Sequence, residues 1–346
     1  MNLPEVFGSP QALRDTFIAG LERQLAEPGL GTFILVLANA SFDGDIWPGL
    51  RAAISERFEA LSGEVRGMLR MGGNPAYPED DLVVFLKLMA MGLDAIRPTE
   101  YRHAGPWEMQ YTPMRALRPA RASGVKAAGV MPPAFNPAGF HFNKPFLQKE
   151  VLWQGVLLRR PCRLLYNKFP FAPWHGLLVP EPESEHPQRL VQELHLHAWH
   201  TARELGTYLP GFGLSYNSYG AYASVNHLHF QTYMRTAPLP IESSIWRHNG
   251  GELVYPASCT VFSNALDAWL HIEHLHDRGT AYNLIYTPER LYCLARCLQG
   301  SYDLPVWCGG HAWYEMAGGV VAFGESDYFG LDEPGIAGAL SKTAPY

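Results

Sequence analysis

The middle of the chain alternates strand-like segments with a single helix, and this order constrains the fold more than any other feature of the sequence. Short apolar runs bounded by turn residues such as Arg160 and Pro161 predict the strands. They cover residues 151–158, 162–166, 176–180, 213–216 and 227–234. A helical pattern at 187–205 separates the third strand from the fourth. Strands, one helix and further strands predict an antiparallel sheet with a helix packed on one face.

The C-terminal third of the chain echoes this pattern. A helical run at 266–278 is followed by strand-like runs at 281–286 and 291–295. We therefore expect an α+β fold of antiparallel sheets with helices on one face. The echo is loose, and the residues alone leave open whether the unit is duplicated.

The N-terminal third predicts mostly helices. The predicted helices cover 9–21, 47–61 and 80–94. The first begins with a cap residue and a first-turn proline, Ser9 and Pro10. Residues 32–38 read as a strand. Residues 98–145 are rich in Pro, Gly and Arg, and predict irregular structure or short strands that wrap the core.

Composition and charge exclude several classes of function. A chain of 346 residues with 47% hydrophobic and 17% charged residues suits a globular protein with a sizeable core. Its net charge of -6 offers no broad basic surface to a nucleic acid. Acidic residues interrupt the first thirty positions, and the most apolar window, 82–93, contains Lys87 and is too short for a bilayer. We therefore expect a cytoplasmic protein without a nucleic-acid or membrane partner.

The cysteine and histidine patterns do not predict a metal site. The five cysteines are an odd number without a Cys-x-x-Cys motif, which favours reduced thiols. His197 and His200 lie three apart on a predicted helix, and residues 271–277 hold three histidines with acidic neighbours. Neither group completes a ligand set in the sequence, so we expect no metal ion and no cofactor.

The sequence Asn-His-Leu-His-Phe-Gln gives the strongest indication of chemistry. Side chains alternate between the faces of a strand, so His227, His229 and Gln231 are expected to point the same way. Leu228 and Phe230 would then face the core. A neutral imidazole attacks phosphorus readily near neutral pH, because its ordinary pKa is about 6.5. Taken alone, two alternating histidines are as often ordinary residues satisfied by their neighbours.

The loop before these histidines favours a phosphate site. Residues 216–225 are small and polar and include a glycine, so their amides and hydroxyls can approach an anion. The candidates for binding nucleotide phosphates in and beside this loop are Asn217, Ser218, Ser224 and Asn226.

With these residues in view, the chain resembles a known superfamily. Residues 216–231, continued by 238–242, are similar to the histidine-triad (HIT) and galactose-1-phosphate uridylyltransferase superfamily, most closely to the GDP-L-galactose and GDP-D-glucose phosphorylases. Residues 166–179 are similar to the nucleotide-binding strand-turn-strand of that branch and of dinucleoside-tetraphosphate phosphorylases. Weaker similarity covers 118–119, 140–152, 282–285 and 313–316. The resemblance implies a HIT-like fold that is duplicated in one chain.

The resemblance implies specific roles for the motif. His229 matches the histidine that takes the nucleotidyl group, and His227 would orient that ring or touch phosphate. Gln231 stands where histidine-triad hydrolases have a third histidine. Its amide can bond a phosphoryl oxygen without titrating, which implies transfer to an acceptor other than water.

The nucleotide-binding segment supplies further candidates. Lys168, preceded by Asn167, would offset the charge of a diphosphate or of orthophosphate. His175 would either contact the nucleotide or support the strand beside it. Ser224 and Asn217 match positions that contact the phosphates in the uridylyltransferases.

The resemblance also sets the expected organisation of the chain and its limits. Asn226 and Leu228 stand where the uridylyltransferase motif has prolines, which counts against a strict uridylyltransferase. We predict one catalytic unit over 1–346, with a probable insertion at 43–103, a nucleophile-bearing half at about 107–245 and a C-terminal half, read as a degenerate repeat, at about 246–346.

The predicted reaction is the phosphorolysis of a GDP-hexose through a covalent nucleotidyl-histidine. The partners would be a nucleoside diphosphate-sugar and orthophosphate or another phosphorylated acceptor. A dinucleoside-tetraphosphate phosphorylase, a hexose-1-phosphate nucleotidylyltransferase and a non-catalytic nucleotide-binding protein remain as alternatives. The base, the sugar, the acceptor and the oligomeric state are left open.

Overall fold

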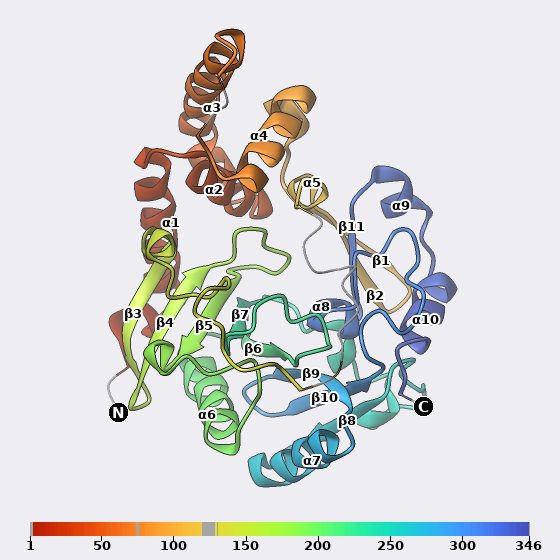
Figure 1. Ribbon diagram of the computed structural model, residues 1–346. Helices are drawn as coiled ribbons and strands as arrows, with labels where there is room; N and C mark the ends of the chain where they lie inside the picture. The colour runs from red at the N-terminus through yellow and green to blue at the C-terminus, as the bar shows by residue number, and fades with distance from the viewer. Residues whose placement is uncertain (1–2, 74–75, 120–128, 130, 346) are drawn as a thin grey trace.

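The computed structural model describes residues 3–73, 76–119, 129 and 131–345, and places helices around two β-sheets (Figure 1). Within these residues, no helix is both long and apolar enough to cross a membrane. The free cysteines form no disulfide among the described residues.

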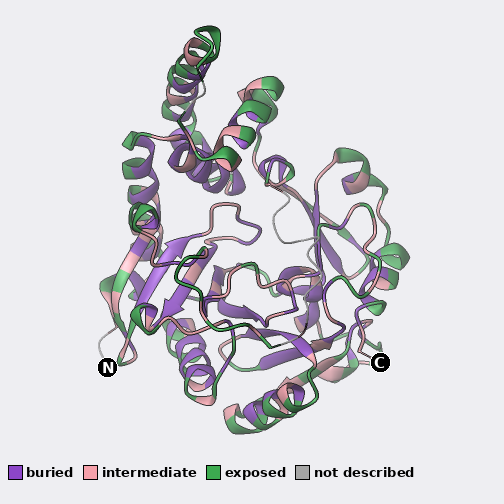
Figure 2. Ribbon diagram, in the orientation of Figure 1, coloured by how far each residue is buried: buried purple, intermediate pink, exposed green. Residues whose placement is uncertain are grey.

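The N-terminal third is helical, and four helices pack around one another. These are α1 (Pro10–Ala26), α2 (Leu30–Phe42), α3 (Trp47–Arg70) and α4 (Glu79–Met91). The Ser9 side chain accepts a hydrogen bond from the Ala12 N–H, so the predicted cap of the first helix is confirmed. Helices α3 and α4 project away from the sheets, and their outer ends are largely exposed (Figures 1 and 2).

The predicted strand at 32–38 is wrong, because this stretch lies inside α2. Every residue of α2 except Gly31 is buried, since α1, α3, α4 and α5 surround it. A helix that is apolar on all sides has no amphipathic period, so its sequence cannot be told from a buried strand.

The main sheet has eight antiparallel strands in the order β3-β4-β5-β7-β6-β9-β10-β8. The strands are β3 (Val151–Leu157), β4 (Arg160–Tyr166), β5 (Gly176–Pro180), β6 (Phe212–Asn217), β7 (Phe230–Met234), β8 (Cys259–Phe262), β9 (Ala281–Tyr286) and β10 (Leu291–Arg296). Helices α6 (Gln192–Tyr208) and α7 (Ala265–Asp277) lie along one face. The predicted α+β fold with antiparallel strands and helices on one face is confirmed.

The order of elements repeats on the two sides of the β6–β9 pair. On one side β5, α6, β6 and β7 follow one another in sequence, and the sheet order is β5-β7-β6. On the other side β8, α7, β9 and β10 follow in the same way, and the sheet order is β8-β10-β9. This topology agrees with the duplication expected for the fold. The boundaries at 43–103, 107–245 and 246–346 stay predictions.

A second, smaller sheet covers part of the other face of the main sheet. It contains β1 (Glu100–Ala104), β2 (Trp107–Tyr111) and β11 (Gly319–Ala322), and β2 pairs in parallel with β11. The short helices nearby are α5 (Pro113–Ala116), α8 (Trp313–Met316), α9 (Glu325–Gly330) and α10 (Glu333–Ser341). The described part of 98–145 therefore combines short strands with irregular structure, as expected.

The two faces of the main sheet pack against different apolar clusters. Leu228 and Phe230 join the core that includes the long helices, as their alternation predicts. On the opposite face, Leu165 and Phe142 belong to a small cluster on the β4–β5 side, and Tyr233 belongs to the core beneath the smaller sheet. The polar residues of the motif lie on this opposite face, between the two clusters.

Candidate functional site

His229 lies just before β7 and is held by a neighbouring side chain rather than by a strand. Strand β7 begins at Phe230, three residues later than predicted. Pro180 has no N–H to continue the ladder, and the chain bonds instead to the 186–188 loop. The buried Gln188 accepts a hydrogen bond from the His229 N–H at 3.0 Å and donates to its carbonyl at 3.4 Å. This pair of bonds fixes the backbone from which the imidazole projects.

The His229 ring presents one nitrogen for chemistry. Its Nδ1 lies 2.8 Å from the His227 carbonyl oxygen, so Nδ1 carries the proton and donates it. Its Nε2 then has a lone pair, and no described residue forms a hydrogen bond with it. Burial lowers the pKa of His229 to about 4, so the ring is neutral at neutral pH. A neutral, aimed imidazole is the form required of a nucleophile.

His227 is oriented by the backbone of a distant loop. The Phe142 N–H donates to Nδ1 of His227 at 3.2 Å, which leaves the ring proton on Nε2. That Nε2–H is buried and has no hydrogen-bond partner among the described residues. Burial, followed by the nearby His229 and His141, lowers the pKa of His227 to about 4. The ring therefore offers a single N–H donor, which lies beside the Pro182 carbonyl without meeting the full geometry of a hydrogen bond.

Gln231 lies in β7, and two donors set the direction of its amide. Both His175 Nε2 and Trp313 Nε1 lie 2.8 Å from Gln231 Oε1. The Phe171 N–H donates to Nδ1 of His175, so the proton of that ring is on Nε2 and points at the glutamine. Burial lowers the pKa of His175 to about 3 and keeps it neutral. With its oxygen occupied, Gln231 turns its NH2 group away from His175 and Trp313.

The predicted phosphate-binding residues divide into two groups. Asn217 and Asn226 are bonded within the protein: Asn217 Oδ1 accepts from Asn283 and the Trp313 N–H, and Asn226 Oδ1 accepts from the Gln188 N–H. Ser218 Oγ accepts from the Tyr282 N–H. Ser224 is exposed. Of these four residues, only Ser224 has a side chain without a hydrogen bond to a described residue.

Lys168 is paired with an acidic residue of the helical region. Its Nζ lies 2.5 Å from Asp81 Oδ1 of α4, and both side chains are largely buried. A Cβ at Gly31, in the first turn of α2, would lie 2.6 Å from Asp81 Oδ2, so a glycine there leaves room for the pair. The neighbouring Asn167 lies against His175, with Nδ2 and Nε2 3.2 Å apart. The structure thus brings Asn167 beside the motif and directs Lys168 toward α4.

Two arginines that were not among the predicted site residues lie near the 167–175 loop, although the weaker similarity at 118–119 includes one of them. The Arg115 guanidinium donates to the Phe169 carbonyl at 2.7 Å and lies 4.8 Å from the centroid of the Phe171 ring. Its Nε is buried without a partner, and burial, then the charge of Arg118, lower its pKa to about 9. Among the described residues, neither Arg115 nor Arg118 forms an ion pair. Arg115 is partly buried and Arg118 is exposed, and two positive charges without an ion-pair partner favour an anionic ligand.

The nearest source of negative charge is already engaged. Glu315 is the carboxylate that acts on both Arg115 and Arg118. Its Oε2 accepts the Ala312 N–H at 3.1 Å, and burial raises its pKa. By comparison, the buried Arg235 forms two hydrogen bonds with the Glu108 carboxylate, at 3.0 and 2.6 Å. Only the three-dimensional arrangement reveals which arginines lack such a partner.

Within the described part of the chain, no group of three or more His, Cys, Asp or Glu side chains is placed to hold a metal ion. His197 lies 3.6 Å from Cys162 Sγ, and His276 Nε2 lies 2.7 Å from the Tyr282 hydroxyl. One histidine from each of the two histidine clusters noted in the sequence thus has a contact within the protein.

The sequence segment that contains the motif histidines is similar to segments of known proteins. Residues 130–233 match the family model described as GDPGP1-like, N-terminal domain. A segment of 119 residues is 40% identical to human GDP-D-glucose phosphorylase 1, and covers 32% of this chain and 30% of the human protein. A segment of 84 residues is 40% identical to GDP-L-galactose phosphorylase 1 of Arabidopsis thaliana, and covers 24% of this chain and 19% of that protein.

The fold has a counterpart among solved structures. The crystal structure of yeast Ap4A phosphorylase Apa2 superposes with a TM-score of 0.50 at 15% sequence identity, covering 77% of this chain and 94% of the yeast chain. This similarity is one of fold. The curated relatives, in contrast, match over less than a third of their own length.

Proposed function

Because residues 130–233 match the GDPGP1-like family model and segments of this chain are similar to GDP-hexose phosphorylases, we propose that it is a nucleotidyltransferase that phosphorolyses a GDP-hexose. His229 Nε2 attacks the α-phosphorus, the bond to the β-phosphate oxygen breaks, and hexose 1-phosphate leaves. Orthophosphate then attacks the nucleotidyl-histidine and releases GDP. Atoms balance without any oxidant, reductant or metal-bound group.

The observation that carries this proposal is the tautomer of His229. Its Nδ1–H is bonded to the His227 carbonyl at 2.8 Å, and its Nε2 has no described partner. The ring is also neutral over the physiological range, because burial lowers its pKa. An imidazole with a fixed proton and an unused lone pair is prepared for attack rather than for a structural role.

The remaining groups supply hydrogen bonds and charge. The NH2 group of Gln231 and the Nε2–H of His227 are donors suited to the non-bridging oxygens of the α-phosphate. Arg115 and Arg118 provide the positive charge that a leaving sugar phosphate and the incoming orthophosphate require. Ser224 and Lys168 stay predicted phosphate ligands, with Lys168 available once it leaves Asp81.

The test is a panel of GDP-, UDP- and ADP-hexoses and diadenosine tetraphosphate, each incubated with and without phosphate. We expect a GDP-hexose to leave a nucleotidyl adduct on the protein without phosphate and to yield GDP with it. Mass spectrometry of the intact chain and of its peptides detects the adduct and assigns it to His229. Absence of both adduct and nucleoside diphosphate across the panel would falsify the proposal.

The same panel separates the alternatives. Turnover of diadenosine tetraphosphate in preference to sugars would make the chain a dinucleoside-tetraphosphate phosphorylase. Transfer to a second hexose 1-phosphate instead of orthophosphate would indicate a nucleotidylyltransferase. Binding without an adduct would indicate a nucleotide-binding protein. The cytoplasmic location stays a prediction, and localisation of the tagged chain in its host tests it.

A further inference from the structure

The loop that carries Phe142 reaches the histidine pair without belonging to a strand. The backbone hydrogen bonds within 131–144 are local turns, such as the bond from the Lys144 N–H to the His141 carbonyl. Local turns do not anchor a loop to the body of a protein. Side-chain contacts must therefore set its position relative to the sheet.

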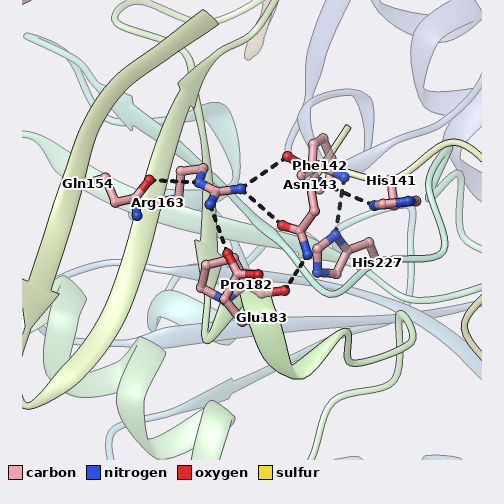
Figure 3. A network of polar contacts seen from close by, with 8 residues as sticks. All are labelled: His141, Phe142, Asn143, Gln154, Arg163, Pro182, Glu183 and His227. Atoms are coloured by element: carbon pink, nitrogen blue, oxygen red, sulfur yellow. Dashed lines mark hydrogen bonds and ion pairs between the residues drawn. The ribbon is translucent and has the colours of Figure 1, made fainter. Parts of the chain in front are cut away.

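The buried Arg163 of β4 anchors the Phe142 end of the loop (Figure 3), and Asn226 holds its other end through the Pro133 and Ala134 carbonyls. Only 4% of its side chain is exposed. Its Nε donates to Gln154 Oε1 at 3.0 Å, and its Nη1 donates to Asn143 Oδ1 at 2.9 Å and to the Phe142 carbonyl at 3.3 Å. Its Nη2 pairs with Glu183 at 3.0 Å. One planar guanidinium thus joins two strands of the sheet to the loop.

Both polar backbone groups of Phe142 form hydrogen bonds with side chains. Its carbonyl accepts from Arg163, and its N–H donates to Nδ1 of His227. Asn143 adds a second attachment, because its Nδ2 donates to the Pro182 carbonyl at 2.8 Å. Figure 3 shows these contacts running continuously from Gln154 to His227.

We propose that Arg163 is a positioning residue for the reaction at His229: it holds the Phe142 N–H on Nδ1 of His227 and so fixes which nitrogen of that ring carries the proton. The inference rests on the proposed function, which gives the remaining Nε2–H its use toward phosphate. Arg163 acts through Phe142 and touches neither histidine by a hydrogen bond.

The Phe142 side chain extends the effect to both imidazoles. Its ring stacks on His227, with centroids 5.6 Å apart at 30°, and meets His229 edge-on at 5.0 Å. A displaced loop would therefore loosen both rings. A displacement of about 1 Å at a reacting group costs about 100-fold in rate.

Three titratable groups near His227 lower its pKa, and the Pro182 carbonyl opposes them. His229 lies on its own segment, His141 lies on the loop, and Arg163 lies on β4, and each of them disfavours the protonated ring. His227 can accept the Phe142 N–H only when its Nδ1 carries no proton. Geometry and charge thus select one protonation state.

The experiment measures the His227 ring directly, by long-range 1H–15N NMR of protein labelled with 15N-histidine. A His227→Asn variant assigns the signals. In the parent chain we expect the Nε2–H tautomer and a pKa near 4. In Arg163→Met we expect a mixture of tautomers, a pKa that rises toward about 6.5, and a kcat about 100-fold lower with a smaller change in KM.

Two further variants make the test decisive. Asn143→Ala breaks the bridge to Pro182 while leaving the arginine in place, and should give a smaller change of the same kind in a chain that folds. Glu183→Gln is the matched control, because Glu183 is 78% exposed and its loss leaves three bonds of Arg163 intact. An unchanged His227 tautomer and pKa in folded Arg163→Met and Asn143→Ala would overturn the proposal. Since the NMR readout needs no turnover, its result is independent of whether the proposed reaction occurs.

Discussion

The two sides of the candidate site differ in how their polar groups are satisfied. On the histidine side, His229 donates one hydrogen bond to the protein, and His227 and Gln231 accept theirs, so that one polar atom of each side chain is fixed. On the arginine side, Arg115 and Arg118 have no described carboxylate as an ion-pair partner. The protein therefore fixes the orientation of the groups on the histidine side, whereas the arginine side favours an anionic ligand.

The largest effect should follow loss of the nucleophile. We expect His229→Ala to lower turnover about 10^4-fold or more and to abolish the adduct, while a GDP-hexose still binds through the arginine side. Adduct mass and calorimetric binding measure the two properties separately. Normal turnover in this variant would remove His229 from the mechanism.

The second-largest loss of rate should follow substitution of Arg115 or Arg118. Arg115→Met and Arg118→Met each remove a positive charge that has no ion-pair partner among the described residues, so we expect the rate with orthophosphate to fall about 10^2–10^3-fold. Folding should be retained, because the unpaired charge is costly without ligand. Thermal melting with and without phosphate checks the second point. If phosphate raises the melting temperature of the parent chain and of the variants equally, the two arginines do not bind phosphate.

Gln231→Leu should have a smaller effect. It removes the donor to the α-phosphate and leaves the His175 and Trp313 donors without an acceptor, and we expect kcat to fall about 100-fold. Gln231→Glu keeps the acceptor and replaces the NH2 donor with negative charge, so it should lose at least as much activity. Single-turnover kinetics of adduct formation measure both variants. Equal rates in the parent and Gln231→Glu chains would exclude the amide as a phosphate donor.

Release of Lys168 should change binding only a few-fold. Asp81→Asn removes the charge that holds the lysine, so we expect KM for the nucleotide sugar to fall about threefold at low salt, with a steeper dependence on ionic strength. Glu79→Gln, on the exposed side of the same helix, is the control for net charge. Identical salt dependence in both variants would mean that Lys168 does not meet substrate.

The smallest expected change is the response to pH. The pKa of His229 lies near 4 in the folded chain, below the ordinary value of about 6.5, so the neutral ring persists as pH falls and is lost only near pH 4. Between pH 8 and pH 5.5 the rate of adduct formation should therefore change by less than about twofold, whereas an ordinary histidine would lose about tenfold. Rapid-quench measurement across this range provides the test. A tenfold loss of rate between pH 8 and pH 5.5 would show that burial does not lower the pKa of His229.

The sequence predicted the motif more completely than it predicted the surroundings. Alternation placed Leu228 and Phe230 in the core correctly, because it depends only on extended backbone. It could not show that Gln188 rather than a strand holds His229, since this pairing joins positions 41 residues apart. Resemblance drew attention to Lys168, but its contact with Asp81 depends on how α4 packs.

The arginines show a different limit. Their signal is the lack of an ion pair with any described carboxylate, and a linear sequence does not record which charged side chains pair in space. Helix α2 was misread for the opposite reason, because burial on all sides erased its period. Residues with a local pattern were thus predictable, and residues defined by their neighbours were not. The chemical roles of the predicted site residues stay predictions until the variants are measured.

The topological repeat has a consequence for stoichiometry. Strands β6 and β7 are separated by the long segment that carries both motif histidines, whereas their counterparts β9 and β10 are joined by a tight turn closed between Thr287 and Arg290. The turn between β9 and β10 therefore carries no segment that corresponds to the one with the motif histidines. One chain should accept one label, however large the excess of donor.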